Sequence, residues 1–382
     1  MIAAMAASEL RALLDSGERV WLVDVREEHE LALGRLPDAQ CVPRGVFEER
    51  IEAVAPHRDA LVVVYCASGR RSLVAARTLL ELGYSRVASL VGGFERWASG
   101  GNPVVHPTSL TEAQRERYAR HLTLAEVGPA GQERLLRARV LVVGVGGLGS
   151  PVALYLAAAG VGTLGVVDDD VVDVSNLQRQ ILHATSRIAM PKIASAVHAL
   201  RDLNPDVAVV PHRERLSEAN AESLVEGYDV VVDASDNFAT RYALNEACVR
   251  HAIPLVHGSI HRFEGQVTTF VPGGPCYRCL SAEPPPRGAA PSCGELGVLG
   301  VLPAVIGSLQ ATEVVKLLLG IGAPLVERLI RYDALRLRFF EFRYRRESAC
   351  ATCGPHRSSR TPTREEASTP DGEGRSTVIA RR

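Results

Sequence analysis

Short apolar runs alternate with longer segments of mixed apolar and polar residues along most of the chain. Residues 20–25 and 61–65 are nearly continuous apolar runs, and residues 73–82 have apolar positions at helical spacing before Gly83. Runs of this length are typical of buried strands, and the segments between them are typical of covering helices. We therefore predict a small α/β domain over residues 1–104.

We predict that residues 105–112 are a linker and that a polar helix begins at Ser109. A longer series of alternating strands and helices follows. Repeated alternation of strand and helix predicts a doubly wound, Rossmann-like sheet within residues 113–357. The apolar run 296–309 is too short for a membrane span and predicts a buried helix. The polar composition of residues 358–382 predicts a disordered tail. The strands expected in the second domain are residues 140–143, 164–167, 207–210 and 230–233.

Composition and charge narrow the class of protein. Of 382 residues, 46% are apolar and 23% are charged, and 43 Lys and Arg nearly balance 44 Asp and Glu. This balance does not favour nucleic acid or an anionic membrane as a partner. The first residues lack the pattern of a secretory signal, so we expect a cytoplasmic protein. Its eight cysteines then indicate metal ligands and reactive thiols rather than disulfides.

The loop from Cys66 to Ser72 is the first candidate site. Cys66 follows a predicted strand, a helix follows the loop, and Arg70 and Arg71 are adjacent in sequence. Loop N–H groups, a helix N-terminus and nearby cations all stabilise a thiolate, which could carry sulfur as a persulfide. A buried structural cysteine is the alternative interpretation.

Residues 1–104 resemble a single rhodanese domain. The resemblance rests on the Cys66–Ser72 loop and on three further motifs, with Arg35 standing where the family often has histidine. It implies that Cys66 is the persulfide carrier and that thiosulfate or a cysteine-desulfurase persulfide is the sulfur donor. The further motifs are Asp-Val-Arg-Glu at 24–27, Gly-Arg-Leu-Pro-Asp-Ala at 34–39, and Val-Gly-Gly-Phe at 91–94 followed by Trp97.

A glycine-rich loop at residues 144–149 follows a predicted strand, and Asp168 ends the next strand. This pattern is the dinucleotide fingerprint, and an NAD-dependent dehydrogenase is one interpretation. Arg179 and Lys192 offer cations that could neutralise phosphates, and Asp236 offers a carboxylate suited to magnesium. These groups favour phosphoryl chemistry over hydride transfer. Surface ion pairs and a helix cap are the alternative interpretations of the three residues.

Residues 109–356 resemble the ThiF/MoeB family, whose adenylation domain is shared with ubiquitin-activating enzymes. The resemblance implies that ATP and magnesium bind here, and that a ubiquitin-like sulfur carrier ending in Gly-Gly is adenylated at its C-terminal glycine. It also implies a homodimer in which Arg120 reaches the ATP of the neighbouring subunit. Ala189 stands where the family often has glycine. The residues assigned to nucleotide binding are Gly144, Gly146, Gly147, Gly149, Asp168, Asp170, Ser175, Asn176, Leu177, Gln178, Arg179, Lys192, Asp236 and Asn237.

Two Cys-x-x-Cys pairs lie about seventy residues apart, at Cys276 and Cys279 and at Cys350 and Cys353. Four thiolates saturate a tetrahedral zinc ion, so we predict a closed structural zinc site. A redox dithiol or two unrelated pairs is the alternative. Cys293 follows a Pro- and Ala-rich loop. In some members of the family a cysteine at this place links covalently to the carrier, and in others it is dispensable, so both interpretations stay open.

Together these resemblances imply an adenylyltransferase and sulfurtransferase that forms the thiocarboxylate of a sulfur carrier of the MoaD or ThiS type. The pathway would be molybdopterin, thiamine or related sulfur-metabolite biosynthesis. One alternative is a member of the same superfamily without sulfur transfer, such as a tRNA-modifying dehydratase. The other is a non-catalytic scaffold that binds the carrier.

Overall fold

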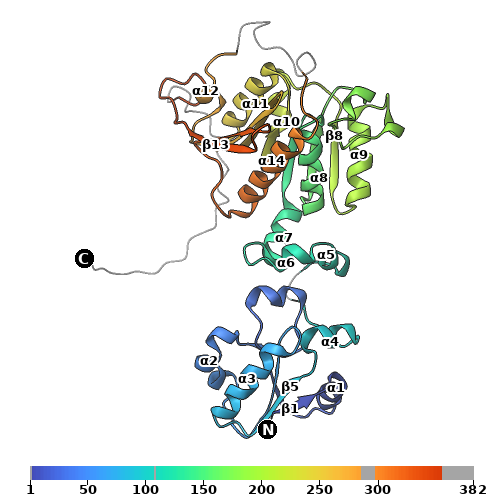
Figure 1. Ribbon diagram of the computed structural model, residues 1–382, viewed down its shortest axis with the longest axis vertical. Helices are drawn as coiled ribbons and strands as arrows, with labels where there is room; N and C mark the ends of the chain where they lie inside the picture. The colour runs from blue at the N-terminus through green and yellow to red at the C-terminus, as the bar shows by residue number, and fades with distance from the viewer. Residues whose placement is uncertain (1, 107–108, 285–296, 355–382) are drawn as a thin grey trace, which may run out of the picture.

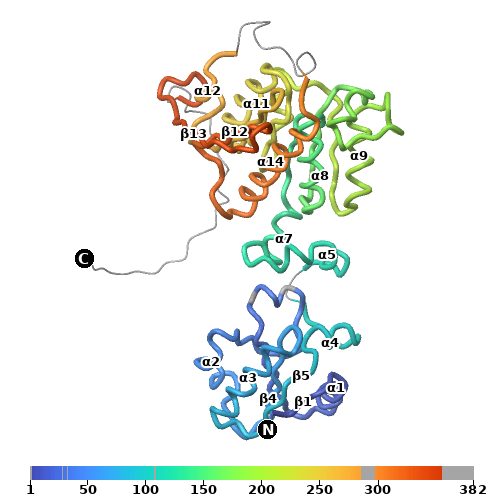
Figure 2. The backbone as a smooth tube through the Cα atoms, viewed as in Figure 1, coloured from blue at the N-terminus to red at the C-terminus, as the bar shows by residue number. Residues whose placement is uncertain are grey.

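The computed structural model describes residues 2–106, 109–284 and 297–354. These residues form two α/β units, each built on its own sheet (Figure 1). The helices α5 (Glu112–Arg117), α6 (Ala119–Leu122) and α7 (Gly128–Arg137) lie between the two sheets in the chain, and Figure 2 shows them between the two units in space. The α/β class predicted from the sequence is confirmed.

The first unit is a five-stranded parallel sheet with the strand order β1-β5-β4-β2-β3. Apolar residues alternate between its two faces, which gives one core against α2 and α3 and another against α1 and α4. Its elements are β1 (Ala3–Met5), α1 (Ala7–Asp15), β2 (Val20–Asp24), η1 (Glu28–Leu33), β3 (Gln40–Cys41), η2 (Arg44–Val46), α2 (Phe47–Val54), β4 (Leu61–Tyr65), α3 (Arg70–Glu81), β5 (Arg86–Leu90) and α4 (Gly93–Ser99).

The second unit is an eight-stranded sheet with the order β13-β12-β11-β10-β9-β6-β7-β8. The five neighbouring strands β10, β9, β6, β7 and β8 are parallel. The strands β10, β11, β12 and β13 form an antiparallel meander. Its strands are β6 (Arg139–Val143), β7 (Thr163–Val167), β8 (Ala208–His212), β9 (Val230–Asp233), β10 (Leu255–His261), β11 (Glu264–Phe270), β12 (Arg328–Asp333) and β13 (Arg338–Arg343).

Helices cover both faces of this sheet, as expected for a doubly wound fold. One core contains residues of α7, α8, α9 and α14, and the other contains residues of α10, α11 and α12. The helical elements are α8 (Gly149–Ala159), η3 (Val174–Asn176), η4 (Thr185–Arg187), α9 (Lys192–Leu203), α10 (Ala221–Val225), α11 (Phe238–Arg250), α12 (Tyr277–Leu280) and α14 (Leu302–Leu319).

Two helix positions expected from the sequence are wrong. The buried helix is α14, which begins at Leu302, because Gly297 and Gly300 precede it and Pro303 suits a first turn. The polar helix begins at Glu112 rather than Ser109, because Thr111 caps it by accepting the N–H of Gln114.

The described residues contain one helix, α14, that is long and apolar enough to cross a membrane by composition alone. Half of it is buried, and it packs against α8, β10 and β11 (Figure 1). Its buried Glu313 accepts hydrogen bonds from the Thr269 hydroxyl and the Leu325 N–H. The helix is therefore a core helix of the second unit.

Candidate functional sites

The Cys66 loop connects β4 to α3 and presents the thiol to backbone N–H groups. The Gly69 N–H donates to the Cys66 sulfur at 3.2 Å, and the Ser72 hydroxyl lies 3.7 Å from it. Burial raises the pKa of Cys66, but hydrogen bonds from Ser72, Gly69 and Arg71 outweigh burial, so the pKa is lowered overall. The thiolate needed for sulfur transfer is favoured chiefly by this cradle of donors.

The two arginines of the loop differ in their surroundings. Arg71 forms a bidentate ion pair with Glu30, at 2.6 and 2.7 Å, and this pair raises the pKa of Arg71, with a further contribution from Cys66. Arg70 is exposed. The sequence analysis gave both arginines the same role, but Glu30 already neutralises much of the charge of Arg71.

The loop is tightly packed against the segment that follows β5. Phe94 and Glu95 donate their N–H groups to the carbonyls of Cys66 and Ala67, at 2.8 and 3.0 Å. A Cβ on Gly93, whose φ is +57°, would overlap the Cys66 carbonyl. This close approach explains the paired glycines of the 91–94 motif.

The second site is a cavity of about 900 Å³ at the carboxyl ends of β6, β7 and β9. This volume suits a nucleotide and part of a second substrate. Its walls include Gly144, Gly146, Gly147, Asp168, Asp170, Arg179, Lys192, Asp236 and Asn237, nine of the residues assigned from the sequence.

The glycine-rich loop leaves room for phosphates. Gly144, with φ +91°, approaches Ala234, and a Cβ there would lie 2.8 Å from the Ala234 carbonyl oxygen. Gly149 packs against Gly144 rather than lining the cavity. Beneath the loop, Asp168 accepts N–H groups of Val145 and Asp170 at 3.0 and 2.9 Å, so its carboxylate is placed to receive ribose hydroxyls.

The cations of the cavity are held in place before any nucleotide binds. The Lys192 ammonium is buried at the start of α9 and contacts the Asp170 carboxylate at 2.8 Å. Arg179 donates to the Ser175 carbonyl at 3.0 Å. Burial raises the pKa of Asp168, while Lys192 opposes this shift. A phosphate that enters here would displace the Asp170 carboxylate, and its own oxygens would then contact the Lys192 ammonium.

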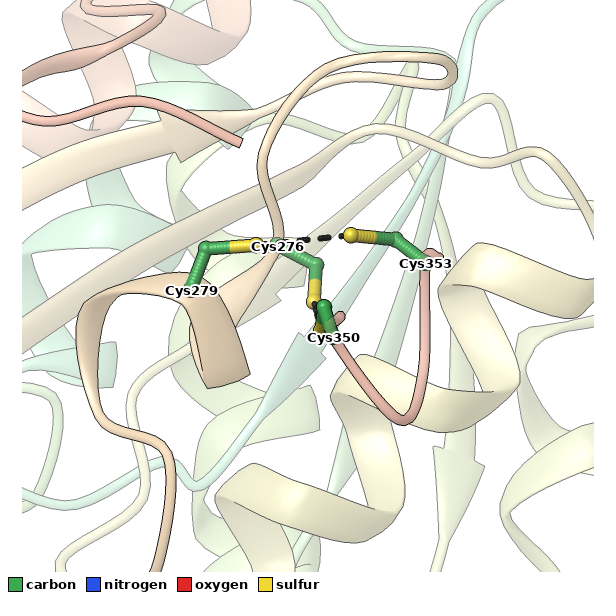
Figure 3. A group of neighbouring side chains, drawn as sticks. All are labelled: Cys276, Cys279, Cys350 and Cys353. Atoms are coloured by element: carbon green, nitrogen blue, oxygen red, sulfur yellow. Dashed lines mark hydrogen bonds between the residues drawn. The ribbon is translucent and has the colours of Figure 1, made fainter. Parts of the chain in front are cut away.

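The third site is the cluster of Cys276, Cys279, Cys350 and Cys353, whose sulfur atoms all lie within 4.8 Å of one another. Figure 3 shows the two pairs facing each other from segments far apart in sequence. Cys276 lies 3.6 Å from Cys350, and Cys279 lies 3.4 Å from Cys353, measured between sulfurs. These separations exceed a disulfide bond and fit the edges of a tetrahedral site, where zinc–sulfur bonds are about 2.3 Å.

Some residues assigned from the sequence are not brought to the cavity. Ser175, Asn176, Leu177 and Gln178 do not line it within the described residues, and Ser175 bonds instead to the Asp173 carboxylate. Arg120 is exposed on α6, and Cys293 lies outside the described residues. The roles assigned to these residues stay predictions.

The cavity also contains residues that the sequence analysis missed. Arg241 and Tyr277 line its far half, and below them His257 donates Nδ1–H to the buried Asp233 carboxylate at 2.7 Å. Arg241 lies in the first turn of α11, five residues after Asp236, which directly precedes the helix cap Asn237. This short spacing from Asp236 is a signal that the sequence offered. Tyr277 and His257 carry no such signal, because α12 and the strand β10, which pairs with β9, bring them here.

The Rhodanese-like domain family matches residues 6–100, and the ThiF family matches residues 118–352. The sulfur carrier protein adenylyltransferase of Thermus thermophilus is 52% identical over 65% of this chain and 94% of its own length. The probable adenylyltransferase/sulfurtransferase MoeZ of Mycobacterium tuberculosis is 49% identical over 62% of each chain.

A solved structure of MccB from E. coli covers 62% of this chain and 74% of its own, with a TM-score of 0.57 and 22% identity. This likeness shows the fold alone. Since the ThiF match spans more than half of the chain, this protein belongs to the ThiF family, with a rhodanese-like domain preceding its ThiF domain.

Proposed function

We propose that this protein adenylates the C-terminal glycine of a ubiquitin-like sulfur carrier with ATP and then transfers sulfur to it from Cys66. The observation that carries the proposal is the joint presence of a phosphate-binding cavity and an activated cysteine loop in one chain. The names of the similar proteins from Thermus and Mycobacterium support both halves of the reaction.

In the first half-reaction, a carrier carboxylate oxygen attacks the α-phosphorus of ATP, and pyrophosphate leaves. Lys192 and Arg179 stabilise the negative charge that accumulates on the phosphate oxygens. Asp236 is exposed to the cavity and could hold Mg²⁺, which would supply further positive charge to the phosphates. The product is a mixed anhydride between the carrier and AMP.

In the second half-reaction, the terminal sulfur of a Cys66 persulfide attacks the carbonyl carbon, and AMP leaves. The carrier is then joined to Cys66 through an acyl disulfide. We assign to Cys293 the next step, in which its thiolate attacks the Cys66 sulfur, the sulfur–sulfur bond breaks, and the thiocarboxylate leaves. This leaves a Cys66–Cys293 disulfide, which an external thiol must reduce before the next turnover. None of residues 2–106 lines the nucleotide cavity, so the activated carrier end must move to reach Cys66.

We also propose that the four-cysteine cluster holds zinc. Burial and the neighbouring Cys279 and Cys353 raise the pKa of Cys276, and burial raises that of Cys279, so a cation is needed to hold these two sulfurs as thiolates. The donor set therefore fits zinc, which would supply two positive charges and a fixed tetrahedral geometry. The Asn245 side chain and the Glu347 N–H donate to these sulfurs at 3.7 and 3.4 Å, as supporting groups of a metal site do.

Pyrophosphate exchange tests the first half-reaction. The native protein should exchange labelled pyrophosphate into ATP only when a carrier ending in Gly-Gly is added, and Asp236→Ala should abolish exchange. Asp202→Ala, at an exposed position on α9, is the matched control and should keep full activity. Carrier-independent reduction of NAD in place of exchange would refute the proposal. A monomer with full exchange activity would refute the homodimer and the role of Arg120.

Mass spectrometry of the carrier tests the second half-reaction. After incubation with ATP and thiosulfate, Cys66→Ser should leave exchange intact but form no thiocarboxylate. Cys41→Ser, in β3 of the same domain, is the control and should form it normally. If Cys66→Ser forms the thiocarboxylate at the native rate, the rhodanese-like domain is not the sulfur donor.

A further inference from the structure

The nucleotide cavity has two halves of different chemistry. The half around the glycine-rich loop contains Lys192 and Arg179 and suits phosphates. The other half is lined by hydroxyl, amide and apolar groups of β10, β11, α12 and β12. These residues are Ser259, Ile260, Gln266, Tyr277, Leu280, Ser281 and Leu329. Such a surface suits an extended peptide, which brings its own backbone hydrogen-bonding groups, better than a triphosphate.

Arg241 lies at the junction of the two halves. It projects from the first turns of α11, and its guanidinium donates to the carbonyl of Ser235 at 3.2 Å, directly before Asp236. Arg241 and Tyr277 line the same cavity. The guanidinium therefore stands between the carboxylate assigned to magnesium and the tyrosine of the peptide half.

The positive charge of Arg241 has no carboxylate partner among the described residues. Its Nε–H is buried and has no acceptor in the part of the chain that the structure describes, whereas the comparable cation Lys192 is paired with Asp170. Asp233 is close enough for its pKa to be lowered by Arg241, but its own carboxylate is occupied by His257 and Ser235. Arg241 is partly buried, and a buried N–H without an acceptor is costly unless a ligand supplies one.

We infer that Arg241 binds the C-terminal carboxylate of the carrier and places it beside the α-phosphate. The inference rests on the proposed function and names the group that receives the substrate. A carboxylate approaching a triphosphate meets strong repulsion, and a planar guanidinium can bind it by two hydrogen bonds. The Tyr277 hydroxyl, which lines the same cavity, provides a further donor at the same place.

The surroundings of Arg241 keep it in position. The Asn237 side chain caps α11 by accepting the Thr240 N–H at 2.9 Å, and the guanidinium packs over the Phe238 ring at 5.1 Å. The Tyr277 N–H donates to the Asn245 side chain at 2.7 Å, and the Tyr277 ring packs edge-on against Tyr242, with 5.2 Å between ring centroids. Cys276, which precedes Tyr277, belongs to the four-cysteine cluster. The carboxylate site is thus formed by α11 and by the segment 276–279, whose two cysteines would bind the metal.

Binding of two forms of the carrier tests the inference without relying on turnover. One form ends in the natural carboxylate and the other in a carboxamide, and both are titrated with a non-hydrolysable ATP analogue present. The native protein should bind the carboxylate form about 10- to 100-fold more tightly, as expected for a charge-assisted bidentate contact. Arg241→Gln should bind both forms equally, and Arg241→Lys should retain part of the difference.

Exchange kinetics separate this role from phosphate binding. Arg241→Gln should raise the KM for the carrier by a similar factor and leave the KM for ATP within about twofold of native. Arg250→Ala, at the exposed end of the same helix, is the control and should change neither. Equal discrimination by Arg241→Gln and the native protein, or a higher KM for ATP alone, would overturn the inference. Absence of carrier-dependent exchange in the native protein would instead overturn the proposed function.

Discussion

Removing the Ser72 hydroxyl should raise the pKa of Cys66. Ser72 is buried, and the Cys66 thiol donates to its hydroxyl at 3.7 Å. The backbone N–H of Ser72 and, to a smaller extent, its side chain both lower the pKa of Cys66. A hydrogen bond to a charged group contributes about 1.5–3 kcal/mol, and one pKa unit equals about 1.4 kcal/mol. Since this contact is long, the lower figure applies, and Ser72→Ala should raise the pKa by about one unit.

The rate of Cys66 alkylation by iodoacetamide, followed on its peptide by mass spectrometry across pH, measures this shift. Below the midpoint, Ser72→Ala should react about tenfold more slowly than native, and above both midpoints the rates should converge. Ser68→Ala is the control, because Ser68 belongs to the same loop but is exposed. An unchanged midpoint in Ser72→Ala, or an equal shift in Ser68→Ala, would show that the hydroxyl does not stabilise the thiolate.

Three further perturbations follow from the structure. Gly93→Ala should remove sulfurtransferase activity and lower the melting temperature, because its Cβ overlaps the Cys66 carbonyl; native activity would contradict this packing. Cys279→Ser should reduce zinc from about one ion per chain to none by elemental analysis and lower the melting temperature, and a metal-free native protein would exclude the zinc site. Burial lowers the pKa of His183 from 6.5 to about 4, so the unfolded chain binds the proton first as pH falls. Stability should therefore fall between pH 6.5 and 4, by up to about 3 kcal/mol, and His183→Gln should show a flatter pH dependence in thermal melts.

The sequence by itself determined the α/β class, the main parallel strands and much of the three candidate sites. Strand β9 has the predicted ends, because an apolar run bounded by polar residues specifies a buried strand locally. The Cys66 loop, the glycine-rich loop and the cysteine pairs were also evident, since each depends on residue types at short spacings. Boundaries failed where glycine or a capping residue overrode the apolar pattern, as at Leu302, where α14 begins.

Only the tertiary structure decided which charges are free and which are already paired. Because Arg71 is close to Cys66 in sequence, we predicted that its charge stabilises the Cys66 thiolate. In the structure, Glu30, which is 41 residues away, neutralises much of the charge of Arg71. Conversely, the sequence does not single out Arg241 as a binding residue. Its role became visible only in the fold, where β9, α11 and α12 converge and its guanidinium has no carboxylate partner among the described residues. The strength of a charge depends on burial and on partners from distant segments, and these are properties of the fold rather than of any local stretch of sequence.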